Sequence, residues 1–254
     1  MKKILVIGIG SGHPEQLTIQ AVNALNQTDV FFFMDKGPHK QALNGLRRAL
    51  CERYISARDY RIIETPNPER MPGQDDYLKS VEQLNTDKQA VFARLIGAQL
   101  REDECGAFMV WGDPSLYDST LRILDALLAS GQAVFEYEVI PGITSVQALT
   151  ARHKIPLNTI GGAVHVTTGR RLHQGMTGDA DSVVVLLDAD NSHRHVDQAL
   201  HIYWGAYLGT AEEILISGAL GDVAEQIIQT REAAREANGW IMDTYVLKRG
   251  GPAN

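Results

Sequence analysis

A carboxylate next to a glycine lies near the middle of the chain, in the segment Trp111-Gly112-Asp113-Pro114. An apolar stretch precedes it and predicts a buried strand that ends abruptly, because Pro114 has no N–H for a strand ladder and restricts the backbone of Asp113. Ligands of open α/β sheets bind at the carboxyl ends of strands, where glycine leaves the backbone accessible. We therefore expect a binding site here, although a simple turn explains these four residues at least as well when they are taken alone.

A glycine loop, Gly8-Ile9-Gly10-Ser11-Gly12-His13-Pro14, follows a predicted first strand and precedes a helical pattern. With Asp35 at the end of a second predicted strand, it imitates a dinucleotide-binding fingerprint. The imitation is imperfect, because His13 replaces the third glycine and Pro14 crowds the place where helix N–H groups would receive a pyrophosphate. A nicotinamide-dependent oxidoreductase remains the alternative function, and it would use Gly8, Gly10, Gly12 and Asp35.

Two further polar groups are candidates for binding. Arg170 and Arg171 follow a predicted strand over 164–168, so they could receive substrate carboxylates through bidentate contacts, although solvation at the surface explains them equally well. Four other residues could suggest a metal site, but their polar, Asn- and Ser-containing surroundings and the lack of a companion motif favour a solvated loop without metal. They are His193, His195, Asp197 and His201.

The composition limits the class of protein. The chain has 254 residues, 44% of them hydrophobic, with a net charge of −7 and a pI near 5.6. This acidity argues against a general nucleic-acid or anionic-membrane binder. The two cysteines, Cys51 and Cys105, lack metal-ligand spacing and are typical of buried thiols in a reducing cytoplasm. The start of the chain predicts a strand rather than a signal peptide, and no run approaches the roughly 20 apolar residues of a membrane span.

The pattern of elements predicts an α/β protein with two domains. We expect an α/β N-terminal domain over 1–113, an α+β C-terminal domain over 120–254, and a pivot near 112–119. Helices are predicted near 17–25, 43–54, 77–100, 121–128, 146–152, 196–200 and 220–236. Strands are predicted near 3–9, 29–34, 61–64, 108–112, 133–140, 164–168, 183–187, 213–217 and 240–247.

Taken together, these motifs resemble the tetrapyrrole methylase family. The segments that carry the resemblance occur in the family's order and cover most of the chain: Gly8-Ile9-Gly10-Ser11-Gly12-His13-Pro14 with Leu17-Thr18, Trp111-Gly112-Asp113-Pro114, Pro141-Gly142-Ile143-Thr144-Ser145 and Ile155-Pro156-Leu157. The resemblance implies two α/β domains with S-adenosylmethionine in the cleft between them. Segments 110–119, 201–210 and 239–245 further resemble members of the aerobic route to cobalamin. For these members the implied reaction is methylation of carbon 1 of precorrin-5 with release of acetate.

The family's cofactor contacts can be transferred onto matching positions of this chain. The Gly112-Asp113 turn and Leu116 would hold the methionine moiety, and Ser11 stands where many members have proline. The other implied cofactor contacts are Trp111, Thr144, Ser145, Leu187 and Gly209. Trp111 and Leu187 depart from the family's usual glycine and methionine, so the contacts of their side chains are the least secure part of the transfer.

The implied deacetylation needs its own chemistry, because water must attack an acyl carbon and a group must take its proton. The candidates are Asp35, Tyr117 and Asp118; turn capping and packing explain these side chains as well, and acetate could leave without specific help. The substrate would be a small tetrapyrrole. The resemblance and the apolar segment 202–207 predict a homodimer, although a buried strand is an alternative explanation of that segment. A non-catalytic tetrapyrrole carrier is a third possibility.

Overall fold

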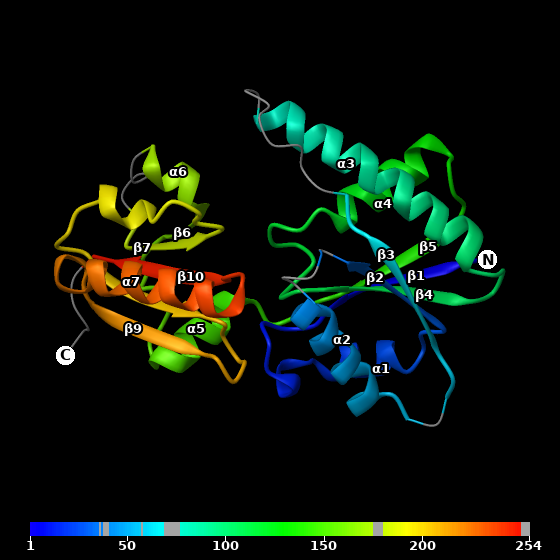
Figure 1. The fold of residues 1–254 in the computed structure, drawn as a ribbon, viewed down its shortest axis with the longest axis horizontal. Helices are drawn as coiled ribbons and strands as arrows, with labels where there is room; N and C mark the ends of the chain where they lie inside the picture. The colour runs from blue at the N-terminus through cyan, green and yellow to red at the C-terminus, as the bar shows by residue number, and fades with distance from the viewer. Residues whose placement is uncertain (36, 38–40, 57, 69–76, 175–179, 250–254) are drawn as a thin grey trace. The chain divides into compact units, whose positions relative to one another are not determined.

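The computed structural model of the protein describes residues 1–35, 37, 41–56, 58–68, 77–174 and 180–249. Contacts divide the chain into two compact units, and each contains one five-stranded sheet (Figure 1). The first unit comprises Met1–Gly10 and Pro14–Ile143, and the second comprises Ser11–His13 and Thr144–Asn254. The predicted α/β class with two units is confirmed.

The sheet of the first unit is parallel throughout, with the strand order β3-β2-β4-β1-β5. Its central strands are continuous apolar runs, as expected of parallel strands that are covered on both faces. The strands are β1 (Lys3–Gly8), β2 (Val30–Asp35), β3 (Arg61–Pro66), β4 (Cys105–Val110) and β5 (Glu136–Ile140).

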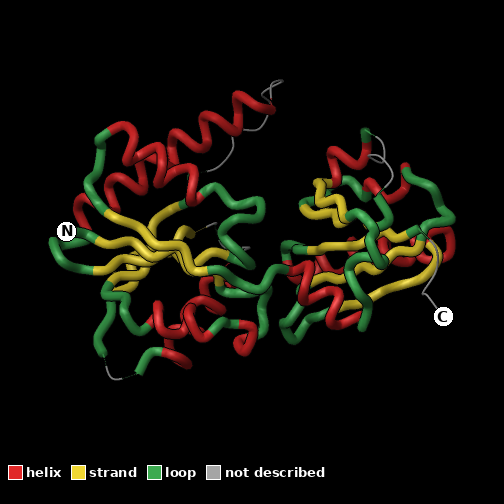
Figure 2. Tube along the Cα trace, turned by 180° about the vertical axis from the view of Figure 1, so that it is seen from behind, coloured by secondary structure: helices red, strands yellow, loops and turns green. Residues whose placement is uncertain are grey.

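Side chains of β1 alternate between two hydrophobic clusters, because successive residues of a strand face opposite sides of the sheet. Ile4 and Val6 pack toward α3 (Tyr77–Arg94) and α4 (Thr120–Ser130), whereas Leu5 and Ile7 pack toward α1 (Ile19–Leu25) and α2 (Gln41–Tyr54). The helices therefore cover both faces of this sheet (Figure 2). A 3₁₀ turn, η1 (Pro14–Gln16), precedes α1, and a π-helical turn, η3 (Leu95–Gln99), follows α3.

The sheet of the second unit is mixed, with the strand order β6-β7-β10-β8-β9. β6 runs parallel to β7, and the other neighbouring pairs are antiparallel. One face packs on α7 (Leu220–Asn238), and α5 (Ser145–His153) also contacts β8 and β10. The strands are β6 (Val164–Thr168), β7 (Ser182–Leu186), β8 (His201–Ala206), β9 (Ile214–Ala219) and β10 (Asp243–Lys248), and the short helices are α6 (Gly169–His173) and η4 (Ser192–His195).

The boundary between the units differs from the predicted one. Residues 120–143 belong to the first unit, because β5 pairs with β1 from Lys3↔Glu136 to Ile7↔Ile140. Apart from the short segment Ser11–His13, the chain thus passes between the units after Ile143 and not within 112–119. The helix expected near 196–200 is also absent, and η4 ends just before that segment. No helix among the described residues is long and apolar enough to cross a membrane.

Candidate functional site

Bare backbone meets at the carboxyl ends of three adjacent strands of the first unit. A Cβ on Gly8 would lie 2.6 Å from the backbone nitrogen of Gly142, and a Cβ on Gly142 would lie 2.0 Å from the carbonyl oxygen of Gly112. Gly112 has a φ of +67°, and its N–H donates to the carbonyl of Gly10 at 2.8 Å. Side chains at Gly8 and Gly142 would therefore separate β1, β4 and β5 at this edge.

Asp113 fixes that edge through its carboxylate. Oδ2 accepts a hydrogen bond from the backbone N–H of Gly142 at 2.8 Å, and Oδ1 accepts from the backbone N–H of Ser115 at 2.8 Å and from its hydroxyl. Burial alone would raise the pKa of Asp113, but these hydrogen bonds outweigh it and lower the pKa below its usual value. Asp113 thus maintains the turn geometry and joins the end of β4 to the end of β5.

Of the three residues predicted to assist deacetylation, all in the first unit, Asp35 is the last residue of β2, and Tyr117 and Asp118 lie on the loop before α4. Tyr117 has a φ of +52° and is 44% exposed, so it does not pack as an ordinary core residue. Asp118 accepts a hydrogen bond from the backbone N–H of Thr120 at 2.7 Å, which begins α4. Asp35 accepts from the backbone N–H of Gly37 at 2.9 Å, so it caps a turn at the end of β2. β2 is the neighbour of β4 in the sheet.

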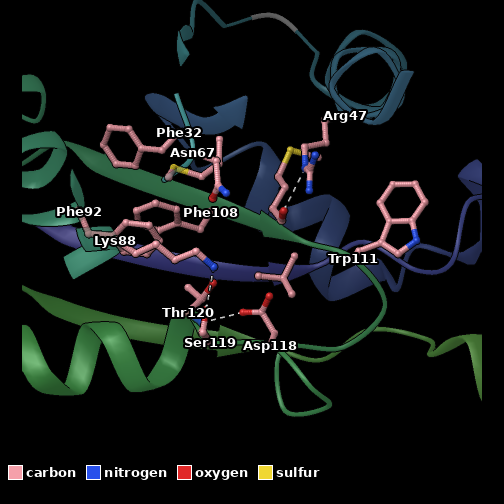
Figure 3. Close-up of a pocket in the computed structure, with 13 residues that line it drawn as sticks. Phe32, Arg47, Asn67, Lys88, Phe92, Phe108, Trp111, Asp118, Ser119 and Thr120 are labelled. Atoms are coloured by element: carbon pink, nitrogen blue, oxygen red, sulfur yellow. Dashed lines mark hydrogen bonds between the residues drawn. The ribbon is translucent and has the colours of Figure 1, made fainter. Parts of the chain in front are cut away.

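A cavity of about 100 Å³ opens near the carboxyl ends of β2 and β4, within the first unit (Figure 3). Arg47 comes from α2 and Lys88 from α3, on opposite faces of the sheet, and Asp118 comes from the loop before α4. Aromatic side chains form its apolar wall. The lining residues are Phe32, Met34, Arg47, Asn67, Lys88, Phe92, Phe108, Met109, Val110, Trp111, Asp118, Ser119 and Thr120.

Sequence reasoning missed Arg47 and Lys88 as functional candidates. A signal was present for Lys88, because Leu84, Phe92 and Leu95 stand at helical spacing from it, so a charged residue occupies the apolar stripe of α3. Arg47 carried no comparable signal, since it lies beside Arg48 on an amphipathic helix. Only the fold shows that Arg47 is partly buried and lines the cavity, whereas Arg48 is exposed and pairs with Glu64.

The second unit gathers several predicted cofactor residues at one edge of its sheet. Thr144 caps α5 in a capping box with Gln147, and the hydroxyl of Ser145 accepts from that of Thr244 at 2.9 Å. Thr244 pairs with the last residue of β7 on one side and with β8 on the other. Leu187 directly follows β7, and Gly209 follows β8. Thr144, Ser145, Leu187 and Gly209 therefore surround the carboxyl ends of β7 and β8.

Three details of this edge are unusual. Leu187 is 66% exposed although it is a large apolar residue, and its φ of +53° lies in the left-handed region that favours glycine. Gly209 has a φ of +81°, and its N–H donates to Glu213 at 2.9 Å. A Cβ on Gly12 would lie 2.7 Å from the carbonyl oxygen of Leu208. Strain and an exposed apolar side chain at a strand end point to a binding function.

Arg170 and Arg171 lie in α6, directly after β6, and both are exposed. Because β6 is parallel to β7, the pair follows the same edge of the sheet as Leu187. Ser11 is buried within the second unit, at 1% exposure. The site that these residues were predicted to form remains a prediction.

The predicted solvated loop at the histidines is wrong for His193, which is 1% exposed and contacts the ring of Tyr245 edge-on. His201 lies in β8. No group of three His, Cys, Asp or Glu side chains in the described part of the chain is arranged to hold a metal ion. Segment 202–207 is also buried, because β8 lies inside the sheet between β10 and β9. Its apolar residues therefore give no support to a dimer interface.

The glycine loop does not have the geometry of a dinucleotide site. α1 begins at Ile19, with Thr18 as its N-cap, so six residues separate Gly12 from the helix. Gly12 itself belongs to the second unit. A pyrophosphate site needs helix N–H groups directly after the glycines, and here the N-cap hydroxyl of Thr18 already accepts from Ala21.

The model of the Tetrapyrrole (Corrin/Porphyrin) Methylases matches residues 3–231. This chain belongs to the tetrapyrrole methylase family. It is 48% identical, over 98% of its length and 96% of the relative's, to precorrin-6A synthase [deacetylating] of a Sinorhizobium species. The crystal structure of a cobalamin synthesis related protein, CobF, from Corynebacterium diphtheriae has a TM-score of 0.81 and 35% identity, with 98% of both chains covered.

The fold of the methylase family extends to more distant members. A uroporphyrin-III C-methyltransferase from Thermus thermophilus, solved with S-adenosylhomocysteine, has a TM-score of 0.61 at 17% identity and covers 97% of both chains. At this identity the likeness concerns the fold alone. The family membership confirms the predicted resemblance, and nothing in the comparisons supports a nicotinamide-dependent oxidoreductase.

Proposed function

We propose that this protein transfers a methyl group from S-adenosylmethionine to carbon 1 of precorrin-5 and releases acetate, which yields precorrin-6A. The observation that carries the proposal is the 48% identity, over nearly the whole of both chains, to a relative named for that product and for deacetylation. A cytoplasmic location and a homodimer belong to the proposal as predictions; the homodimer now depends on the resemblance alone.

The cofactor residues of the proposal come from both units. Gly112 and Leu116 hold the methionine moiety on the turn that Asp113 fixes, with Ser11 and Trp111 nearby. Thr144, Ser145, Leu187 and Gly209 bind the adenosine. The exposed side chain of Leu187, held at a positive φ, supports this assignment because adenine needs an apolar wall. The position of the cofactor between the units stays a prediction.

The bound cofactor supplies an electrophilic methyl group with a good leaving group. The chain's own residues then have to orient the macrocycle and exclude water, and positioning dominates such a reaction. Arg170 and Arg171 bind carboxylates of the macrocycle. Their exposure and their place at the end of β6 support this assignment.

For deacetylation we favour Asp118 over Asp35 and Tyr117. Asp118 is the candidate that lines the cavity with Arg47 and Lys88. Its carboxylate takes a proton from the water that attacks the acyl carbon. The bond between the acyl carbon and the macrocycle then breaks, the water oxygen stays in acetate, and the electron pair stays on the macrocycle.

The decisive experiment is incubation with precorrin-5 and methyl-labelled S-adenosylmethionine, followed by mass analysis of the pigment and an acetate assay. We expect one labelled methyl group and one acetate per pigment. If precorrin-5 binds but is neither methylated nor deacetylated, the protein is instead a tetrapyrrole carrier. A thermal shift with S-adenosylhomocysteine but not with NADH is expected, since a ligand at 100 times its dissociation constant stabilises by roughly 2.7 kcal/mol.

A further inference from the structure

The cavity of the first unit contains two cationic side chains and one anionic one. Arg47 and Lys88 contribute positive charge, and Asp118 contributes negative charge. Neither cation forms an ion pair with a carboxylate among the described residues. The three side chains, which line the cavity and include two partly buried cations, together leave one uncompensated positive charge, and such a charge favours an anion in the cavity.

Arg47 is held in place by neutral groups. Its Nε donates to the carbonyl of Met109 at 3.1 Å, and its Nη1 donates to Asn44 at 3.0 Å and to the carbonyl of Leu43 at 3.5 Å. Burial lowers the pKa of Arg47 to about 10, against a smaller opposite effect of Asp118. Its Nη2 makes no hydrogen bond to any described residue. The guanidinium is thus oriented, and one of its edges is available.

Lys88 approaches the same cavity from α3. Its Nζ makes one long hydrogen bond, 3.4 Å, to the hydroxyl of Ser119 (Figure 3). Burial lowers the pKa of Lys88, and Asp118 opposes that effect only in part. An ammonium group has three donors, so two of them have no partner among the described residues.

The remaining walls restrict what can enter. Phe32, Phe92 and Phe108 pack together, with the rings of Phe92 and Phe108 stacked at 4.2 Å. A volume of about 100 Å³ accommodates a group as large as a few water molecules, such as a carboxylate with a methyl or methylene carbon. The aromatic rings suit that carbon, and the two cations suit the two oxygens.

We propose that this cavity, formed by Arg47, Lys88 and the three phenylalanines, binds a single small carboxylate group. The carboxylate belongs either to released acetate or to an acetate side chain of the tetrapyrrole. The choice of these two sources rests on the proposed function, whereas the carboxylate itself follows from the charges. One monoanion brings the three ionised side chains to neutrality.

The test measures acetate binding to the purified protein by saturation-transfer NMR, without tetrapyrrole, so it does not depend on turnover. Lys88→Met is the main variant, because it removes only the long hydrogen bond to Ser119 and methionine fits the apolar stripe of α3. The variant is therefore expected to fold. Arg47→Gln is the second variant, and Arg48→Gln is the matched control. Arg48 neighbours Arg47 on α2 but pairs with Glu64 at 2.9 Å, and the side chains of Arg48 and Glu64 are each 44% exposed.

We expect acetate to bind the wild type and the control, and each cavity variant to bind it about tenfold more weakly. If free acetate does not bind but Lys88→Met raises the Michaelis constant for the tetrapyrrole about tenfold, the carboxylate belongs to the substrate side chain. Equal acetate binding by all four proteins would overturn the proposal. So would no acetate binding together with unchanged kinetics for the tetrapyrrole. Failure of the proposed function would show separately, as absence of labelled product from the wild type.

Discussion

Two arginines, Arg231 buried in the second unit and Arg47 partly buried in the first, are compensated in different ways. In the second unit the Nε of Arg231 donates to Asp243 at 3.0 Å, and the side chains of this ion pair are 10% and 8% exposed. Arg231 also donates to the carbonyls of Asp188 and Ala189. In the first unit Arg47 has carbonyl and amide partners but no carboxylate partner among the residues that the structure describes.

The difference distinguishes a structural charge from a charge available to a ligand. The carboxylate of Asp243 receives Arg231 and the indole N–H of Trp204 at 3.0 Å, so this network is satisfied within the fold. Burial raises the pKa of Asp243, and Arg231 opposes that effect. Arg47 has no such counterpart in the described part of the chain, and it borders a cavity. A charge that lines a cavity without a counterion from the fold is therefore the better guide to a binding site.

The largest expected effect comes from the same substitution at both arginines. Arg231→Met leaves Asp243 buried without its counterion and should lower the free energy of unfolding by about 3–5 kcal/mol. Arg47→Met leaves no described carboxylate unpaired and should change the free energy of unfolding by about 1 kcal/mol or less, because the lost hydrogen bonds are offset by removal of a partly buried charge without a counterion. Urea unfolding of both variants measures the difference. Equal losses would show that the two arginines are compensated alike.

A smaller effect is expected at Arg170 and Arg171, which are exposed in α6 and are proposed to bind carboxylates of the substrate. The double variant Arg170→Ala, Arg171→Ala should raise the Michaelis constant for the tetrapyrrole roughly ten- to a hundredfold, since a contact between arginine and carboxylate contributes about 1.5–3 kcal/mol. Affinity for S-adenosylhomocysteine should stay the same. Steady-state kinetics at low salt measure the Michaelis constant, and calorimetry measures the affinity for S-adenosylhomocysteine. Loss of cofactor binding would exclude this assignment.

The negative charge of Asp113, in contrast to that of Asp243, is compensated by neutral hydrogen-bond donors and by no arginine that the structure describes. Asp113→Ala removes the acceptor for Gly142 and Ser115, so it should lower the free energy of unfolding by about 1 kcal/mol and weaken S-adenosylhomocysteine binding through the turn. Urea unfolding and calorimetry on the folded variant measure both changes. Unchanged affinity would remove this turn from the cofactor site.

The smallest effect is the pH dependence that Asp113 adds to stability. Its pKa is lowered in the folded protein, so its ionised form contributes stability above the unfolded-state pKa of about 3.9. That contribution is lost as the pH falls through the lowered folded-state pKa. The stability difference between wild type and Asp113→Asn should therefore be constant near neutral pH and decrease below about pH 4. A difference that grows in acid would contradict the assignment.

Local patterns predicted much of the fold. The apolar runs at β1 and β2, the short strand β6 and the amphipathic pattern of α7 lie where the sequence placed them, because burial on one or two faces imposes a fixed period on side chains. The family also followed from the sequence, since its glycine and proline motifs occupy strand ends whose backbone demands are local. Gly112, with its φ of +67°, is one such position.

Contacts between distant residues decided the rest. β5 joined the first unit because it pairs with β1, more than a hundred residues away, and β8 became a buried inner strand because β10 and β9 flank it. In the sequence Arg47 and Arg231 are both arginines of amphipathic helices. Asp243 reaches Arg231 only when β10 packs beside α7, whereas no carboxylate of the described chain pairs with Arg47. Charge compensation depends on distances across the tertiary structure, which residue spacing along one helix does not contain.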